Sequence, residues 1–489
     1  MDSDKKEYGL IIKSLSILGS AQVVSLIIAL LRSKVIVLFL GAKGIAIAGL
    51  FNSTINLFSI TTSLGLEKSA VKEVSFVHEQ NQSKRKIELI SLIRRLGIYT
   101  SILGAFFMFC LSNRLSLFVF KTSDYSYAFS WLALALIFKQ LSQINLSIIQ
   151  GGRGVSNLAR ANVYGSAIGL LFSLPLYYFL GIKAIVPAII ISYLIAFFVS
   201  YYYHNRIVAR VKISINLIED FKKGKGLIKL GVALNFSSLV SMLSVYAFQV
   251  YLTNNTTLKI VGLYLAGTAI LNYAVNIVFN ALSTDYYPRL AAVNNNGEKF
   301  IKILQKQVLI ALLIITPIIV FVGICAPFFI RLLYSSKFLE AFVFIKWAIL
   351  GMLFKAISWS VAYAFVAKGD SKVFFRINLI SSIILLAINI LGFNLDGLEG
   401  LGVSFLIYHI IYFFLTFFIA KNRYKFRFDK GFYYHLSVAV VLCLLSFFMT
   451  YLFGDKLRYI LGALLIIISF SFTLYSINKK MNLKEFLNK

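Results

Sequence analysis

Six basic side chains stand inside stretches of sequence that are otherwise apolar and long enough to cross a bilayer. They are Lys13, Arg32, Lys34, Lys139, Lys346 and Lys355. Charge buried in a membrane is costly, and it usually faces a cavity or an oppositely charged partner. All nineteen Asp and Glu residues fall in tails, in loops or at the ends of apolar stretches. The sequence thus offers the cations no carboxylate inside the membrane, and we infer that an anionic substrate supplies the missing charge.

The elements that position these cations must be membrane-spanning helices. The chain has 489 residues, of which 59% are hydrophobic and 14% are charged, whereas a soluble protein keeps about a quarter of its residues charged. Because apolar runs of about twenty residues recur throughout, we predict an all-α polytopic membrane protein with about 14 transmembrane helices. The expected spans are 10–40, 45–65, 96–118, 126–149, 158–180, 182–203, 230–252, 258–284, 306–330, 340–366, 373–392, 398–420, 432–453 and 458–477.

The charges between the spans indicate how the chain is oriented. With the N-terminus in the cytoplasm, the cytoplasmic segments hold 34 Lys and Arg residues and the opposite side holds 9. This asymmetry follows the positive-inside rule, so we expect both termini to be cytoplasmic. The formal net charge of +30 is then mostly a matter of topology. It requires no nucleic-acid partner, although basic loops could also touch anionic membrane lipids.

A weak internal repeat predicts two related halves. The segment LGSAQVVSLI (18–27) is similar to LGVALNFSSLV (230–240), and each copy contains six spans. We therefore expect two pseudo-symmetric six-helix lobes, with the substrate site between them near the middle of the membrane. The expected limits are 1–210 for the N-lobe, 211–425 for the C-lobe and 426–489 for an added helical hairpin with a cytoplasmic tail.

Three stretches carry a resemblance to a known family. They are LLRSKVIVLFLGAKGIAIAGLF (30–51), SLGLEKSAVKEVS (63–75) and YLAGTAILNYAVNIVFNALSTDYYPRLAAV (264–293). They resemble polysaccharide flippases of the Wzx O-antigen type, in the multidrug/oligosaccharidyl-lipid/polysaccharide exporter superfamily, and are also similar to lipid II flippases. The resemblance covers nearly the whole chain.

The resemblance implies a function and a set of partners. It implies transport of an undecaprenyl-diphosphate-linked glycan, such as an O-antigen or related repeat unit, by alternating access. Transport would run from the cytoplasmic to the outer leaflet of the bacterial cytoplasmic (inner) membrane. The implied partners are this lipid-linked glycan, membrane lipids and polysaccharide polymerase machinery.

Arg32 is the strongest candidate for contact with a diphosphate. Lipid II flippases carry an arginine in their first span, and the resemblance matches it to Arg32. Its planar guanidinium can bind a diphosphate through two parallel hydrogen bonds. Lys34 lies two residues on, about 200° around the helix. It remains a candidate for substrate contact, but its long side chain could instead reach the membrane interface.

Lys139 and Lys355 are further candidates for substrate binding. Lys139 shares a helix face with Gln143, and such a polar face lines a cavity or packs against another helix. Lys355 stands in mid-span on a face with Gly351 and Ser358. The sequence leaves open whether that face meets a cavity or a neighbouring helix.

Polar ladders occupy corresponding spans of the two repeats. Asn52 and Asn56 recur at helical spacing in the second span, as do Asn272 and Asn276 in the eighth. Their amides could bind sugar hydroxyls in a wet cavity, or they could hydrogen-bond between helices. His409 is the only mid-span histidine; it could relay protons or serve as a packing residue.

Two other functions compete with the flippase. A multidrug exporter of the same superfamily would need acidic groups for cationic drugs, and the spans contain none. A membrane-embedded polysaccharide polymerase would need a large external loop, which the spacing of the spans does not leave. The sequence contains no Walker motif, metal-ligand cluster or nucleophile triad. We therefore expect a transporter rather than an enzyme, without a cofactor or metal, and with Na⁺ or H⁺ open as a coupling ion.

Overall fold

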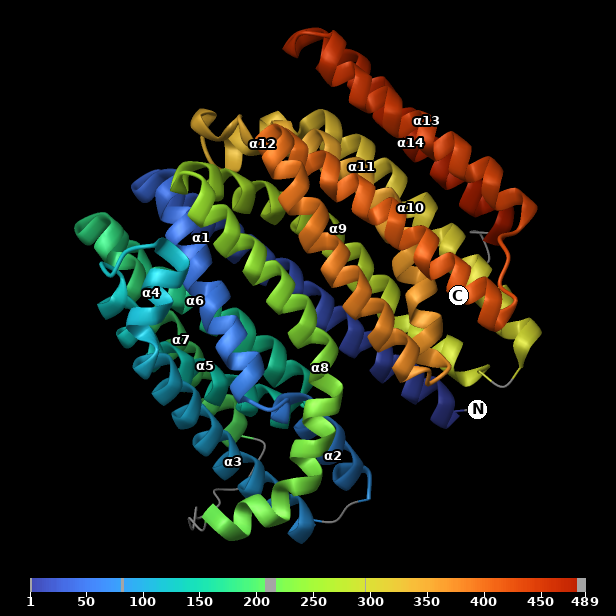
Figure 1. Cartoon of the computed structure of the whole chain (residues 1–489). Coiled ribbons are helices and arrows are strands. Elements are labelled where there is room, and N and C mark those ends of the chain that lie inside the picture. Colours follow the sequence, from blue (N-terminus) through green and yellow to red (C-terminus); the bar gives the residue numbers. More distant parts are fainter. Residues whose placement is uncertain (1, 81–82, 207–216, 295, 482–489) are drawn as a thin grey trace. The chain divides into compact units, whose positions relative to one another are not determined.

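The computed structural model describes residues 2–80, 83–206, 217–294 and 296–481, and these residues form helices joined by short connections (Figure 1). The α-helices are α1 (Asp2–Thr62), α2 (Leu66–Glu79), α3 (Ser83–Cys110), α4 (Ser112–Phe120), α5 (Ser126–Gly151), α6 (Val155–Leu180), α7 (Ile185–Asn205), α8 (Leu217–Asn255), α9 (Leu258–Ala292), α10 (Gly297–Leu333), α11 (Ala341–Ala367), α12 (Ser371–Tyr424), α13 (Lys430–Leu452) and α14 (Asp455–Met481). Two 3₁₀ turns, η1 (Gly181–Ala184) and η2 (Ser336–Phe338), complete the described elements.

The described helices account for the predicted crossings. Among the described residues, ten segments are long and apolar enough to cross a membrane. Three of them, of 44, 51 and 54 residues, are about twice the length that one crossing needs. Each bends midway: at Gly41 (φ 65°), at η1, and at Asp396 and Gly397 (φ 49°). We count two crossings in each of these three segments, one in each of the other seven and one in α9. The chain is therefore the all-α polytopic membrane protein that the sequence predicts.

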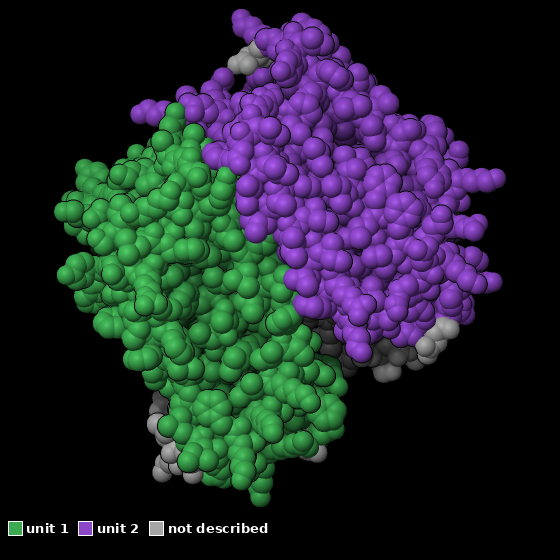
Figure 2. Space-filling model, viewed as in Figure 1, with its two compact units in different colours: residues 1–262 green, residues 263–489 purple. Residues whose placement is uncertain are grey.

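The chain divides into two compact units (Figure 2). They comprise residues 1–262 (unit 1) and 263–489 (unit 2). These units are defined by packing. The expected lobes at 1–210 and 211–425 and the added hairpin at 426–489 are defined by the sequence repeat, and they stay a prediction. In unit 2, the added hairpin of α13 and α14 packs on α10, where Val320 and Ile324 meet Leu442 and Leu465.

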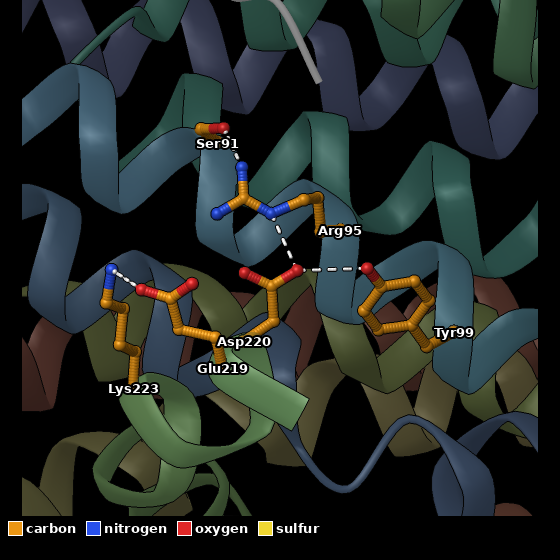
Figure 3. Close-up of polar contacts among 6 residues, drawn as sticks. All are labelled: Ser91, Arg95, Tyr99, Glu219, Asp220 and Lys223. Atoms are coloured by element: carbon orange, nitrogen blue, oxygen red, sulfur yellow. Dashed lines mark hydrogen bonds and ion pairs between the residues drawn. The ribbon is translucent and has the colours of Figure 1, made fainter. Parts of the chain in front are cut away.

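The start of α8 is fastened to α3 inside unit 1 by a buried ion pair (Figure 3). The Asp220 carboxylate accepts hydrogen bonds from Arg95 Nε at 2.8 Å and from the Tyr99 hydroxyl at 2.9 Å. Arg95 also donates to Ser91 Oγ. The side chains of Arg95 and Asp220 are only 15% and 4% exposed. Removing either partner would therefore leave the other charge buried and uncompensated.

We expect the substitution Asp220→Ala to lower the free energy of unfolding by about 3 kcal/mol, the typical cost of breaking a buried ion pair. The neighbouring pair, Glu219 with Lys223, provides a matched control, because its side chains are 53% and 63% exposed. Glu219→Ala should have an effect within a few tenths of a kcal/mol. Denaturant unfolding in detergent micelles measures both variants, and equal losses would contradict the buried clamp.

Candidate substrate-binding site

A cavity of about 170 Å³ lies among α1, α6 and α7, entirely within unit 1. It is lined by Arg32, Ile36, Ala48, Asn52, Gly165, Ser166, Tyr177, Ala188, Ile189, Ser192, Tyr193 and Ala196. Among these described lining residues, Arg32 is the only charged side chain. Four hydroxyl groups and the Asn52 amide accompany it, so the cavity is partly polar, positively charged and free of lining carboxylates.

Two glycines of α6 set the width of this cavity. Gly165 and Gly169 lie one turn apart, and a Cβ on either would come within 3.4 Å of a Cα atom of α7. Small residues at this spacing allow two membrane helices to approach closely. The Arg32 Nη2 atom lies 3.5 Å from the Cβ position of Gly169. A larger side chain in place of Gly169 would therefore compete with the Arg32 guanidinium for the same space.

The guanidinium of Arg32 is sparsely hydrogen-bonded. Its Nη2 donates to the Ser166 carbonyl oxygen over 3.4 Å, and its Nε is buried without a partner. A guanidinium carries five N–H donors, and Arg32 makes no other hydrogen bond to the residues that the structure describes. Buried donors without partners are uncommon, and a bound ion or water is one explanation for them. Arg32 is thus placed to receive an anion in the cavity.

Lys139 of α5 lies behind the cavity wall and is 7% exposed. Its Nζ donates to Asn56 Oδ1 on the second half of α1 and stands 5.7 Å from the ring centroid of Tyr193. The Tyr193 hydroxyl donates to Asn52 Oδ1 at 3.2 Å. Tyr193 therefore connects Lys139 to the cavity that contains Arg32.

The polar ladder of the second span is divided between two environments. Asn52 lines the cavity. Asn56 binds Lys139, while Gln143 Oε1 accepts a hydrogen bond from Ser59 Oγ at 3.2 Å. These last contacts join α1 to α5, so in this conformation Asn56 and Gln143 hold helices together.

Carboxylates approach two of the six cations. Lys346 forms an ion pair with Glu399 at 2.8 Å, and Trp347 Nε1 donates to the same carboxylate at 2.8 Å. The expectation that every one of these cations lacks a carboxylate is therefore wrong for Lys346. Glu67, on α2, acts electrostatically on Lys139; burial raises the pKa of the Glu67 carboxyl, and the positive charge of Lys139 opposes that rise.

The remaining candidates lie elsewhere. Lys34 is half-buried and does not line the cavity around Arg32. Lys355 belongs to unit 2, where its Nζ stands 6.0 Å from the ring centroids of Phe279 and Phe405. Asn272 is exposed on α9. The side chains of Asn276 and Lys13 lie outside the described residues.

Sequence reasoning missed the residues of α6 and α7 that complete the cavity. Tyr193, Tyr177 and Ser166 accompany Arg32, and none of them carries a charge to mark it in an apolar span. Two signals were available: the Gly165-xxx-Gly169 spacing, and the adjacent polar residues Ser192 and Tyr193 within the apolar run of α7. Both indicate a helix face that meets another helix rather than lipid.

Two family models and one relative match the sequence of this chain. The sequence model of the family described as "Polysaccharide biosynthesis protein" matches residues 35–343. A second model, described as "Lipid II flippase MurJ", matches residues 260–470. A relative from Borreliella burgdorferi, named "Probable lipid II flippase MurJ", is 22% identical over 441 residues, which cover 84% of this chain and 83% of the relative.

Solved structures agree with the fold. A lipid II flippase MurJ in an inward closed conformation superposes with a TM-score of 0.70 at 16% identity, covering 95% of this chain and 99% of that one. An inward-facing multidrug resistance transporter of the MATE family also gives a TM-score of 0.70, at 13% identity, covering 82% of this chain and 94% of that one. At such identities the likeness shows the fold alone.

Proposed function

This chain belongs to the polysaccharide biosynthesis protein family, and from that premise we propose what it carries and how. It is a multi-pass membrane transporter of the multidrug/oligosaccharidyl-lipid/polysaccharide exporter superfamily, in the group that moves lipid-linked substrates. We propose that its substrate is an undecaprenyl-diphosphate-linked oligosaccharide, such as an O-antigen or related repeat unit. It moves this substrate from the cytoplasmic to the outer leaflet of the bacterial inner membrane.

The observation that carries this proposal is the state of Arg32. Its guanidinium faces a cavity without a lining carboxylate and leaves most of its donors unused. A diphosphate supplies the negative charge and paired oxygens that such a fork binds best. A cationic drug would instead be repelled by Arg32. The geometry therefore favours the flippase over a multidrug exporter of the same superfamily.

The size of the cavity supports a headgroup site. Pockets for drug-sized ligands usually measure about 300–1,000 Å³, and this one measures about 170 Å³. It suits a phosphate group rather than a whole glycan or a prenyl chain. Asn52, Tyr193 and Ser192 offer further polar contacts to the phosphate oxygens or to the first sugar. Alternating exposure of this site to the two sides of the membrane, driven by a Na⁺ or H⁺ gradient or by the membrane potential, would complete transport.

A peptidoglycan precursor is the second candidate substrate. The match to the lipid II flippase model over residues 260–470 and the relative from Borreliella burgdorferi favour it. Both candidates share a diphosphate on a lipid carrier, so Arg32 would serve either one. They differ in the headgroup beyond the diphosphate, which the cavity is too small to enclose.

The proposal is tested in cells depleted of this protein, by asking which leaflet holds the lipid-linked oligosaccharide. An external glycan-cleaving reagent reports the outer leaflet, and permeabilised cells give the total. We expect complete units to accumulate where the reagent cannot reach them, and re-expression should restore access. Mass analysis of the accumulated headgroup separates an oligosaccharide repeat unit from a peptidoglycan precursor. Unchanged access to both lipids in depleted cells would overturn the proposal.

A further inference from the structure

Two neighbouring side chains of unit 2, His409 and Lys355, each carry a nitrogen atom without a hydrogen-bond partner among the described residues. His409, on α12, is 6% exposed, and its Nδ1 is buried without a partner. The side chain of Lys355, on α11, makes no hydrogen bond or ion pair with the described residues. Its ammonium instead lies against two aromatic rings. An unsatisfied buried polar group in a native protein calls for an explanation, and an absent ion or ligand is one.

The ring of Phe405 brings these two groups together. The imidazole centroid of His409 lies 4.4 Å from the Phe405 centroid, with the ring planes at 68°. The Lys355 Nζ lies 6.0 Å from the same centroid, and Lys355 is close enough to act electrostatically on His409. One turn before Lys355, a Cβ on Gly351 would lie 3.1 Å from the Leu406 Cα atom. The helices α11 and α12 therefore pack closely next to both side chains.

The charge around this pair is uncompensated. Among the described side chains of unit 2, no carboxylate acts on Lys355 or on His409. The Glu399 carboxylate, at the bend of α12, is bound by Lys346 and Trp347. Asp370 is bound by the Tyr424 hydroxyl at the other end of α11. The half-buried ammonium of Lys355, beside the buried imidazole of His409 and two phenylalanine rings, thus has no anionic partner among the described side chains.

We propose that Lys355 and His409 form an anion site in unit 2 that binds a phosphate oxygen of the diphosphate on the lipid carrier. This inference rests on the proposed function and adds His409 to it. The Lys355 ammonium supplies the positive charge. The His409 imidazole, with its proton on Nδ1, supplies a directed N–H donor without needing a charge of its own. The rings of Phe279 and Phe405 lie beside the ammonium, and the low dielectric of such apolar surroundings strengthens both contacts.

Binding of a short prenyl diphosphate, farnesyl diphosphate, to the purified full-length protein in lipid nanodiscs tests the site. Lys355→Met and His409→Phe each remove a donor while keeping bulk, and we expect each to weaken binding about ten- to hundredfold. His409→Asn places an amide N–H near the Nδ1 position and should stay within about threefold of the wild type. Because both groups hold the same anion, the double variant should bind little more weakly than Lys355→Met alone.

His435 provides a matched control. Its Nδ1 already meets the Gly431 carbonyl oxygen in the same unit, so His435→Phe should leave binding unchanged. Inorganic diphosphate serves as competitor: displacement only at a large excess supports a lipid headgroup as the natural ligand, and displacement at equal concentration supports a free phosphate at the same site. If wild-type protein binds farnesyl diphosphate and both Lys355→Met and His409→Phe bind it equally well, the inference fails while the proposed function stands. If the wild type does not bind it, the proposed substrate class fails.

Discussion

Replacing Arg32 with alanine is expected to slow substrate flipping about a hundredfold, because truncating one partner of a desolvated charge pair costs about 2–5 kcal/mol. The variant would leave the diphosphate without its fork-shaped donor in the cavity. Arg32→Lys keeps the charge but loses the paired geometry, so its rate should fall between those of alanine and the wild type. The measurement is transfer of a fluorescent prenyl-diphosphate sugar between the leaflets of proteoliposomes.

A change in folding would not explain the expected loss at Arg32. Its one hydrogen bond to a described residue, 3.4 Å to the Ser166 carbonyl oxygen, is long, and its Nε has no partner among the described residues. The alanine variant should therefore unfold at the same denaturant concentration as the wild type or at a higher one. Ser173→Ala, on the same helix α6 but outside the cavity lining, serves as the control with normal flipping, because its hydroxyl bonds only the Leu170 carbonyl oxygen among the described residues. Wild-type rates in Arg32→Ala would remove this residue from the mechanism.

Gly231→Ala should destabilise unit 1 by about 3 kcal/mol, the upper end of the usual cost of overpacking. A Cβ on Gly231 would lie 2.5 Å from the Leu64 carbonyl oxygen and 2.7 Å from the Gly65 carbonyl carbon. Backbone atoms cannot rotate away as a flexible side chain can. The part of α8 around Gly231 would have to separate from the turn between α1 and α2.

A second glycine of the same helix provides the control for Gly231. A Cβ on Gly226 would meet nothing within 4 Å, so Gly226→Ala should stabilise the helix by up to about 1 kcal/mol through its better helix propensity. Denaturant unfolding of the two single variants separates steric contact from the general effect of alanine. Equal stabilities would show that α8 does not approach the turn as closely as the structure has it.

The fold was largely predictable because span length and composition follow from the thickness of the membrane. Apolar runs located the helices, and the bends at Gly41 and Gly397 fall between spans that the sequence had already separated. The boundary between the two units was harder to predict from the sequence. The repeat marks a boundary near residue 210, whereas packing groups α8 with residues 1–206 in unit 1. Helix-to-helix contacts such as Gly65 on Gly231 depend on three-dimensional proximity that periodicity does not encode.

The site was predictable where charge marked it. Arg32 stood out because a cation in an apolar span needs a reason, and the structure places it in a cavity. Tyr193 and Tyr177 did not stand out, because tyrosine is common in membrane helices. Only the three-dimensional neighbours of these two residues show that they line the cavity. The pairing of Lys346 with Glu399 escaped prediction because these residues are 53 positions apart in sequence.

The way α8 is held has a practical consequence for recombining this chain with a related transporter. A chimaera joined at residue 210 would place α8 from one parent against α1 and α3 from the other. The contacts between Arg95 and Asp220 and between Thr54 and Tyr246 would then have to form between sequences that never evolved together. A junction at residues 256–257, after α8 ends, keeps both pairs within one parent. Exchanges of substrate preference are best attempted at that short turn.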